Sequence, residues 1–328
     1  MINIKTVAKK AGVSPTTASY ALNNRAGVKP ETVEKVLRAA RELNYIPNSL
    51  AQSFRNGKSN TIAVVTHENL EDYSIFSLEL MGIILKAREL DYDVLVKSLP
   101  QDSELHSNEM MQIINGRKAD GVILLGNGFE ELIGQFKAEI HKMILLSSHS
   151  KFGISEVNVN GGKGIYTITE YLIKKGYSTI CYLTFALDTT EELNRERGYR
   201  KALAAYDLSS KENIIACGYN SKAIYETVIK LMETNPPEAI VCWNDLLALQ
   251  VINALKEMGK KIPEDIAVTG FDDIIQDLNY IPHLTTIKQP FTEKGKCAMK
   301  LLADIIENKV KGPVKQEVEC TLVVRESA

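Results

Sequence analysis

Residues 4–22 read IKTVAKKAGVSPTTASYAL, and this stretch decides how the amino-terminal part of the chain folds. Thr6 has a hydroxyl that can cap a first helix, and Gly12 is typical of the position just after a helix. Ser14 can cap a second helix, with Pro15 in its first position, where a missing N–H costs nothing. Two short helices joined by the turn at Gly12 predict a helix-turn-helix motif.

A third helix is predicted to begin at Pro30, because the apolar residues that follow recur at spacings of three and four. They are Val33, Val36, Leu37, Ala40 and Leu43. The two shorter helices supply a facing apolar surface. The first 46 residues therefore form a small helical domain.

This head is basic, whereas the rest of the chain is acidic. The first 58 residues hold ten Lys and Arg and three Glu, a net charge of +7, in a chain whose net charge is −2. Such an asymmetry is expected when one module contacts phosphate. In a helix-turn-helix, the start of the second helix enters the major groove. The expected DNA-contacting residues of the head are Thr6, Ser14, Pro15, Thr16, Thr17, Tyr20 and Asn24. The alternative is that this surface is only a solvated helix face.

Residues 4–19 resemble the amino-terminal signature of the lactose-repressor family of bacterial transcription regulators. Residues 43–48, LNYIPN, match the end of that family's third helix. One departure is Lys29, where the family usually has Ser before Pro-Glu-Thr. A lysine has no acceptor for a free helix N–H, so we expect this helix start to lose a cap. Later matches extend the resemblance over nearly the whole chain; they lie at residues 120–123, 244–245, 262–273, 284–290 and 322–325.

The resemblance implies a division into a DNA-binding domain over residues 1–46, a hinge helix and linker over 47–58, and a core over 59–328. In the family, the hinge helix pairs with that of a second subunit and inserts a side chain into the minor groove. The matching residue here is Phe54, followed by Arg55, where the family usually has Leu. Phe is an established wedge between base steps. The alternative is that Phe54 packs beneath the core and anchors the linker.

The core alternates apolar runs rich in β-branched residues with amphipathic stretches, which predicts an α/β fold with parallel sheets covered on both faces. The strands are expected at residues 61–65, 93–96, 121–125, 143–146, 179–183, 239–242 and 266–270. The helices are expected at residues 78–90, 164–175, 196–205, 223–233, 245–258 and 293–307.

The resemblance implies that this core consists of two lobes, each a doubly wound parallel sheet of the kind found in periplasmic binding proteins. The amino-terminal lobe would comprise about residues 60–158 and 290–318, and the carboxy-terminal lobe about 160–288 and 320–328. Three crossings near residues 159, 289 and 319 would join them, with a small effector bound in between.

Other classes of protein are disfavoured by the sequence. No run of 18 apolar residues and no signal peptide occurs, so we expect a cytoplasmic protein without a membrane partner. The five cysteines are far apart, which argues against disulfides and zinc, and no cofactor is expected. Gly126-Asn127-Gly128 begins like a dinucleotide fingerprint, but Glu131 stands at the third glycine position. No catalytic motif appears, so we do not expect an enzyme.

The effector site is carried over from the resemblance residue by residue. The implied effector contacts are Tyr73, Phe76, Arg195, Asn220, Asn244 and Asp272. A guanidinium suits hydroxyls or a carboxylate, and Asp272 follows a strand end, where ligands of open α/β sheets collect.

Several neighbouring residues allow two interpretations. Asp245 is expected to cap the helix that follows. Phe76 and Trp243 each fit either a ligand contact or the core, and Tyr219 is an alternative to Asn220 as the residue that stacks on the effector.

The sequence thus predicts a homodimeric, sequence-specific DNA-binding regulator, more often a repressor than an activator. It would bind a near-palindromic double-stranded operator and respond to a small effector, most simply a carbohydrate. We expect the dimer to form through residues 78–90, and no heptad pattern follows the last strand to make a tetramer. Two alternatives are a core controlled by a protein partner and a solute-binding protein, which the basic head disfavours.

Overall fold

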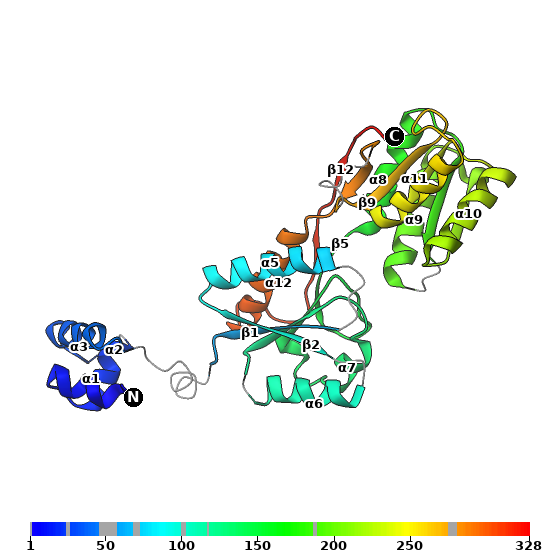
Figure 1. Cartoon of the computed structure of the whole chain (residues 1–328). Helices are drawn as coiled ribbons and strands as arrows, with labels where there is room; N and C mark the ends of the chain where they lie inside the picture. The colour runs from blue at the N-terminus through cyan, green and yellow to red at the C-terminus, as the bar shows by residue number, and fades with distance from the viewer. Residues whose placement is uncertain are drawn as a thin grey trace. The chain divides into compact units, whose positions relative to one another are not determined.

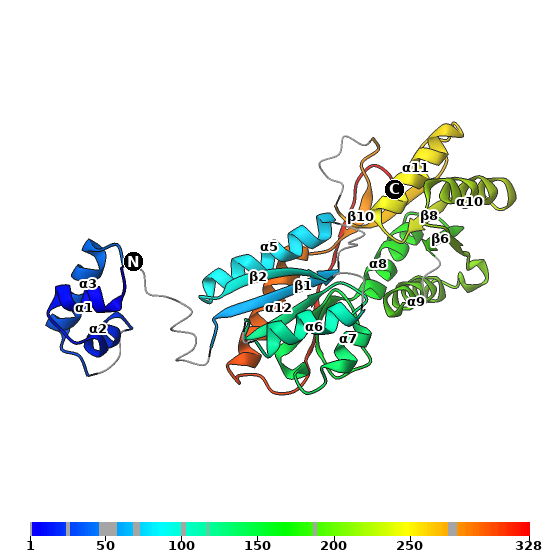
Figure 2. The ribbon, with the colours of Figure 1, turned by 60° about the horizontal axis from the view of Figure 1, so that its bottom comes forward.

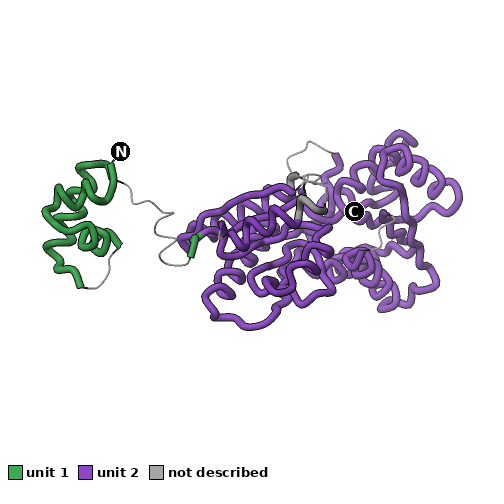
Figure 3. The backbone as a smooth tube through the Cα atoms, turned by 90° about the horizontal axis from the view of Figure 1, so that it is seen from below, with its two compact units in different colours: residues 1–60 green, residues 61–328 purple. Residues whose placement is uncertain are grey.

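The chain divides into two units, residues 1–60 and residues 61–328 (Figure 3). The computed structural model describes residues 2–23, 27–45, 58–67, 73–99, 103–116, 118–185, 189–274 and 281–328. The side chains of residues 73–74 and 103–106 lie outside the described part.

The first unit holds the three predicted helices: α1 (Ile4–Ala11), α2 (Pro15–Leu22) and α3 (Pro30–Glu42). Gly12 ends α1 in the left-handed conformation, with φ +69°, which a residue without a Cβ adopts at no steric cost. The helices bury one small core made of Val7, Ala8, Ala18, Ala21, Val36, Ala39 and Ala40. The helix-turn-helix prediction is confirmed.

The start of α1 differs from the prediction. Asn3, and not Thr6, is the N-cap, and its Oδ1 accepts from the Thr6 backbone N–H at 3.1 Å. The Thr6 hydroxyl also donates to Asn3 Oδ1, at 3.3 Å. The helix therefore begins a turn earlier than Thr6, because a cap must stand three residues before the N–H that it accepts.

The start of α3 agrees with the prediction. Lys29 occupies the N-cap position and makes no side-chain cap hydrogen bond, and Pro30 is the first helical residue.

The amino-terminal lobe of the second unit contains β1, β2, α5 and α12 (Figures 1 and 2). It is built on a parallel sheet of six strands in the order β11-β5-β4-β3-β1-β2. The strands are β1 (Thr61–His67), β2 (Asp93–Leu99), β3 (Gly121–Leu125), β4 (Met143–Leu146), β5 (Ser155–Val159) and β11 (Lys315–Val318). Alternate residues of β1, β3 and β4 enter two separate cores. Helices α5 (Tyr73–Glu89) and α12 (Phe291–Ile306) cover one face, and α6 (Ser103–Ile114) and α7 (Glu130–Gln135) cover the other.

The carboxy-terminal lobe repeats this architecture with the strand order β12-β10-β9-β8-β6-β7. Its strands are β6 (Ile180–Phe185), β7 (Ile214–Cys217), β8 (Ala239–Cys242), β9 (Ala267–Asp272), β10 (Thr285–Lys288) and β12 (Thr321–Val323). Only the pairing of β10 with β12 is antiparallel among these described strands. Helices α8 (Gly161–Lys174) and α9 (Thr190–Ala205) pack on one face, and α10 (Ser221–Thr234) and α11 (Asp245–Glu257) on the other.

The chain passes between the two sheets three times, from β5 to α8, from β10 to α12 and from β11 to β12. These passages lie where crossings were predicted, and the two-lobed α/β fold is confirmed. The predicted strands at 121–125, 143–146 and 239–242 match the observed bounds. Helices α6 and α7 and strands β5, β7, β10, β11 and β12 are not among the predicted ranges. In the described part of the chain, no helix is both long and apolar enough to span a bilayer.

Candidate functional site

The second helix of the head presents a polar surface. Ser14 caps α2: its hydroxyl accepts from the Thr17 backbone N–H at 3.1 Å and lies 2.9 Å from the Thr17 hydroxyl. Pro15 and Thr16 are exposed, and Tyr20, one turn later, is 40% exposed. The residues predicted to contact DNA on α2 therefore share an accessible surface, except that the Thr17 hydroxyl already pairs with the cap.

The basic side chains of the head are exposed as well. Exposed lysines and arginines occur on α1 and α3 at Lys5, Lys9, Lys10, Lys35, Arg38 and Arg41. Lys10 pairs with Glu42 at 2.7 Å, and Arg38 lies 3.7 Å from Glu34. Of the other predicted DNA contacts, Asn24, Phe54 and Arg55 lie outside the described residues.

In the core, four of the six effector residues predicted from the sequence (Arg195, Asn220, Asn244 and Asp272) lie after or at the carboxyl ends of strands of the carboxy-terminal sheet. Arg195 comes from α9, which follows β6, and it is 4% exposed. Its guanidinium carbon lies 3.9 Å from the ring centroid of Phe271 and 4.5 Å from that of Trp243. Nη1 donates to the Trp243 carbonyl at 2.5 Å, and Nε donates to Glu191 at 2.9 Å. The aromatic rings and two acceptors thus fix the orientation of the arginine.

Asp272, at the end of β9, is 4% exposed and lies close enough to Arg195 for its charge to act on the guanidinium. Gln289, at the second crossing, donates from Nε2 to Asp272 Oδ1 at 2.6 Å and accepts from Lys294 Nζ at 3.2 Å. Lys294 on α12 in turn pairs with Glu79 on α5 at 2.7 Å. A buried polar chain therefore leads from the carboxy-terminal lobe into the amino-terminal lobe.

A second set of charged groups also joins the lobes; we call it the interlobe ion cluster. It comprises Lys315, Glu156 and His149 of the amino-terminal lobe and Glu191 and Arg195 of the carboxy-terminal lobe. His149 Nδ1 lies 3.1 Å from Glu156, and its Nε2 lies 3.8 Å from Glu191. Lys315 lies 3.2 Å from Glu156. The hydrogen bond to Glu156 and the contact with Glu191 raise the pKa of His149 to about 9.

Sequence reasoning missed the acidic centre of this cluster. Glu191 stands four residues before Arg195 on one helix, a spacing that favours a pair on the helix surface. The spacing could have indicated the Glu191–Arg195 pair. The contact with His149 could not be predicted, because His149 lies 42 residues earlier in the chain and approaches Glu191 only through the tertiary fold.

Two predicted effector residues turn out to cap helices. Asn244 Oδ1 accepts from the Leu247 backbone N–H at 2.8 Å and so caps α11. The prediction that Asp245 is this cap is wrong: Asp245 is the first helical residue and accepts from Thr286 at 2.6 Å. Asn220 caps α10 in the same way, accepting from Ala223 N–H at 2.8 Å. Each amide keeps its nitrogen donors and a second lone pair on its oxygen, so either atom can contact an effector.

Aromatic side chains lie beside this region. Phe185 stacks on Tyr219, with centroids 4.9 Å apart, and meets the Trp243 ring edge-on at 5.8 Å. Tyr219, and not Asn220, therefore belongs to the aromatic group. Among the described residues, the buried indole Nε1 of Trp243 has no hydrogen-bond partner.

The described aromatic side chains of the amino-terminal lobe make their ring and core contacts within that lobe and not with Arg195. Phe76 is partly buried and packs against the core beneath α5. His67 stacks on Phe129 at 4.3 Å. Tyr73 begins α5, and its side chain lies outside the described part. The described residues contain no group of three or more side chains placed to hold a metal ion.

A basic helix-turn-helix head joined to a two-lobed α/β core defines a class of DNA-binding transcription regulators with a ligand-responsive second domain. Comparison with known proteins agrees with this. The model for bacterial regulatory proteins of the lacI family matches residues 3–48, and the model for the periplasmic binding protein-like domain matches residues 169–328.

The relatives extend the match over the whole chain. The chain is 31% identical to the transcriptional repressor PurR of Vibrio atlanticus over 315 residues, which cover 94% of this chain and 93% of that protein. It is also 31% identical to the uncharacterized regulator YvdE of Bacillus subtilis over 333 residues, covering 100% and 99% of the two chains. The chain therefore belongs to the LacI family of bacterial transcription regulators.

Solved structures show the same architecture. The structure of the lac repressor dimer bound to operator and the anti-inducer ONPF matches with a TM-score of 0.83 at 25% identity, covering 99% of this chain and 98% of that one. A complex of the transcriptional regulator CelR with cellobiose matches with a TM-score of 0.70 at 25% identity, covering 100% of both chains. These relatives are transcription regulators and not enzymes.

Proposed function

We propose that two copies of this chain bind a near-palindromic operator and repress transcription, and that a sugar or sugar derivative bound between the lobes controls operator affinity. The observation that carries this proposal is the exposed start of α2 within a basic head, attached to a core whose two lobes meet beside Arg195, where Glu191 contacts His149. A two-fold dimer presents two copies of α2 and therefore selects a site with matching symmetry.

The base contacts would come from α2. The exposed hydroxyl of Thr16 can donate to and accept from base edges, and its methyl group can contact thymine. Tyr20 adds a hydroxyl and an apolar ring on the same face. Because Ser14 engages the Thr17 hydroxyl, we expect Thr17 to contribute its methyl group. Phe54 is proposed as the minor-groove wedge and Arg55 as its phosphate or groove contact.

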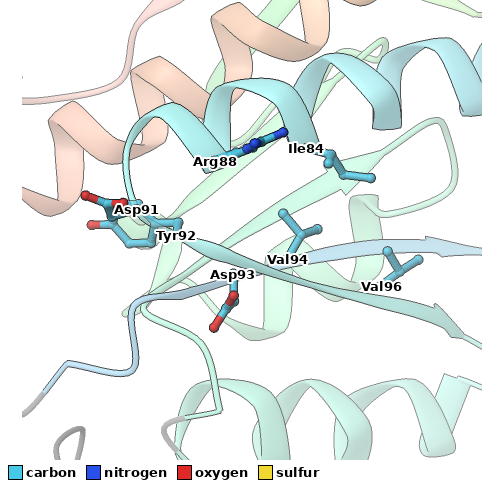
Figure 4. Close-up of a pocket in the computed structure, with 7 residues that line it drawn as sticks. All are labelled: Ile84, Arg88, Asp91, Tyr92, Asp93, Val94 and Val96. Atoms are coloured by element: carbon cyan, nitrogen blue, oxygen red, sulfur yellow. The ribbon is translucent and has the colours of Figure 1, made fainter. Parts of the chain in front are cut away.

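The dimer would form through the amino-terminal lobe. Four apolar side chains of α5, Leu78, Met81, Ile84 and Leu85, are between 41% and 50% exposed. Val96 on the neighbouring β2 is 44% exposed and, with Ile84, lines a hollow beside α5 (Figure 4). Contiguous exposed apolar surface of this kind marks a protein interface. A second copy of the chain is the proposed occupant, since the similar lac repressor structure is that of a dimer.

The effector would bind at Arg195 and Asp272. A guanidinium donates several hydrogen bonds and a carboxylate accepts them, so together they suit a hydroxyl-rich molecule. The indole N–H of Trp243 adds a buried donor, and the ring of Tyr219 adds an accessible flat face. Tyr73 and Phe76 are proposed to contribute from the amino-terminal lobe.

Selection of binding sites from random duplexes tests the DNA-binding proposal. We expect an inverted repeat to emerge. Tyr20→Ala should change base preference, whereas Lys5→Ala should weaken binding to all sequences and lower the salt slope by about one unit. Recovery of direct repeats alone, or of no motif, would contradict a two-fold dimer.

A thermal-shift screen against sugars and sugar derivatives tests the effector proposal, because a ligand that binds only the folded state stabilises it. Operator binding by the full chain should respond to the compounds that raise the melting temperature. Arg195→Ala and Asp272→Ala should retain operator binding and lose this response. If every compound fails while operator binding persists, control by a protein partner becomes the better explanation.

A further inference from the structure

The effector arginine is already occupied by a carboxylate of its own helix. A guanidinium has five N–H donors, and Glu191 Oε1 and the Trp243 carbonyl accept two of them. The Glu191 carboxylate makes the shorter of its two ionic contacts here, at 2.9 Å to Arg195 Nε. The positive charge of Arg195 is therefore offset within the site before any ligand arrives.

Glu191 is held in place from three directions. Arg195 lies on one side and His149 of the other lobe lies on a second, 3.8 Å away. On the third side is the first turn of α8, where a Cβ on Gly161 would stand 1.9 Å from Glu191 Oε1. The start of a helix also favours a nearby anion. Burial opposes ionisation of Glu191, but Arg195 and His149 outweigh it and lower the pKa of this carboxyl to about 2.

The charges around Arg195 balance. Three cationic groups, Arg195, His149 and Lys315, lie among three carboxylates, Glu156, Glu191 and Asp272. Two further acids lie nearby. Burial, together with the Asp272 charge, raises the pKa of Asp245 to about 8, and burial raises the pKa of Glu192. A protonated acid adds no charge and an ionised one adds a negative charge. The cluster therefore has no excess positive charge for an anionic ligand to neutralise.

We propose that Glu191 determines effector charge: by occupying Arg195, it makes the site accept uncharged, hydroxyl-rich molecules and reject phosphorylated or carboxylate ones. This inference rests on the proposed effector site between the lobes. An uncharged hydroxyl can accept from the remaining guanidinium N–H groups and donate to Glu191 or Asp272. An anion must instead displace Glu191 or add an unpaired negative charge to a desolvated cluster, and both are unfavourable.

Sulfate is a suitable probe, since it needs only an available cationic site. Sulfate raises the melting temperature of proteins in general, because it is excluded from their surface. We therefore expect the wild-type chain to show only this gradual rise, equal to that of Arg195→Gln, and no saturable component. Glu191→Gln should bind sulfate saturably and at least about tenfold more tightly, the order expected for one gained charged hydrogen bond. The double variant Glu191→Gln/Arg195→Gln should lose this binding.

A matched control lies on the same helix. Glu196→Gln removes the same charge from another i, i+4 pair, in which Glu196 lies 2.7 Å from Arg200, and it should not create sulfate binding. Gly161→Ala offers a second route to the same result, because its Cβ would push the Glu191 carboxylate aside. If Glu191→Gln does not fold, sulfate binding by Gly161→Ala, compared with that of the wild type, still tests the inference.

Two results would overturn the inference: saturable sulfate binding by the wild-type chain that Arg195→Gln abolishes, or absence of binding by folded Glu191→Gln. A screen of uncharged sugars beside their phosphates and acids separates this inference from the proposed function. A phosphorylated sugar that stabilises the wild type through Arg195 would refute charge selection but leave effector control intact. Loss of all operator response would refute effector control itself.

Discussion

Two of the carboxylate–cation pairs near the junction of the lobes differ in how completely they are enclosed. Glu79 and Lys294 join α5 to α12 with side chains only 1% and 3% exposed, and Ser147 and Gln289 complete their hydrogen bonding. Glu191 is 26% exposed and divides its carboxylate between Arg195 and His149 of the other lobe.

This difference indicates different roles. The Glu79–Lys294 pair is closed within one lobe, so its loss would leave a buried charge and weaken the fold. Glu191 pairs with Arg195 in its own lobe and with His149 in the other lobe, and its carboxylate is partly exposed, so these contacts can change when a ligand or a lobe movement competes for them. A carboxylate–cation pair therefore stabilises the fold at Glu79 and Lys294, whereas at Glu191 it is suited to ligand recognition.

The largest expected effect comes from breaking the enclosed pair. Lys294→Met leaves the Glu79 carboxylate buried without its cation and should lower the free energy of unfolding by about 3–5 kcal/mol. Urea unfolding of the full chain, followed by circular dichroism, measures this. Glu79→Leu/Lys294→Met removes both charges and should recover most of the loss; no recovery would show that the pair is not what Lys294 stabilises.

A smaller effect is expected where α5 and α12 approach each other. A Cβ on Gly82 would stand 2.0 Å from the Thr292 carbonyl oxygen, a backbone atom that cannot rotate away. Gly82→Ala should therefore cost about 1–3 kcal/mol of stability by overpacking. Gly161→Ala makes an equally close approach, but to the end of the Glu191 side chain. Its stability cost should be distinctly smaller, and equal losses in the two variants would contradict this distinction.

His149, which bonds Glu156 of its own lobe and contacts Glu191 of the other lobe, should give a pH-dependent effect of intermediate size. The pKa of His149 is raised from 6.5 to about 9, so protonated His149 stabilises the fold fully below pH 6.5, and this stabilisation is lost as the pH rises to about 9. His149→Gln should reduce stability by about 1–3 kcal/mol at pH 6 and by much less at pH 9.5.

Urea unfolding of wild type and variant across this pH range checks the prediction. Asp245 also titrates within the window, but it does so in both proteins and cancels in the difference. A difference that does not change with pH would mean that His149 acts through packing and not through charge.

The smallest effect is expected for an exposed pair. Arg200 is 45% exposed and pairs with Glu196 at 2.7 Å on α9. Glu196→Gln should change stability by at most about 0.5 kcal/mol, because solvent screens such pairs. Thermal unfolding at low and at high salt measures this change. If Glu196→Gln lowered the free energy of unfolding as much as His149→Gln does, exposure would not explain the difference between the two sites.

Much of the fold was predictable because its signals are local. Ser14, Pro15 and Pro30 mark helix starts, and β-branched runs mark buried strands such as residues 143–146. The wrong predictions are also local. Thr6 was predicted as a cap in place of Asn3, and Asp245 in place of Asn244, because neighbouring polar residues compete for one position and only the backbone geometry selects between them. Helix α9 begins at Thr190, earlier than predicted, because Thr189 caps it.

The sequence by itself determined the helical head and the alternating α/β core, because caps and periodicity act within a few residues, and the family resemblance implied Arg195 as an effector contact. Only the tertiary structure decided which charges meet. Glu191 reaches His149 across 42 residues, and Gln289 links Asp272 to Lys294 from the chain's second passage between the lobes. Such contacts depend on how two separately folded sheets are joined, and no local spacing encodes that distance.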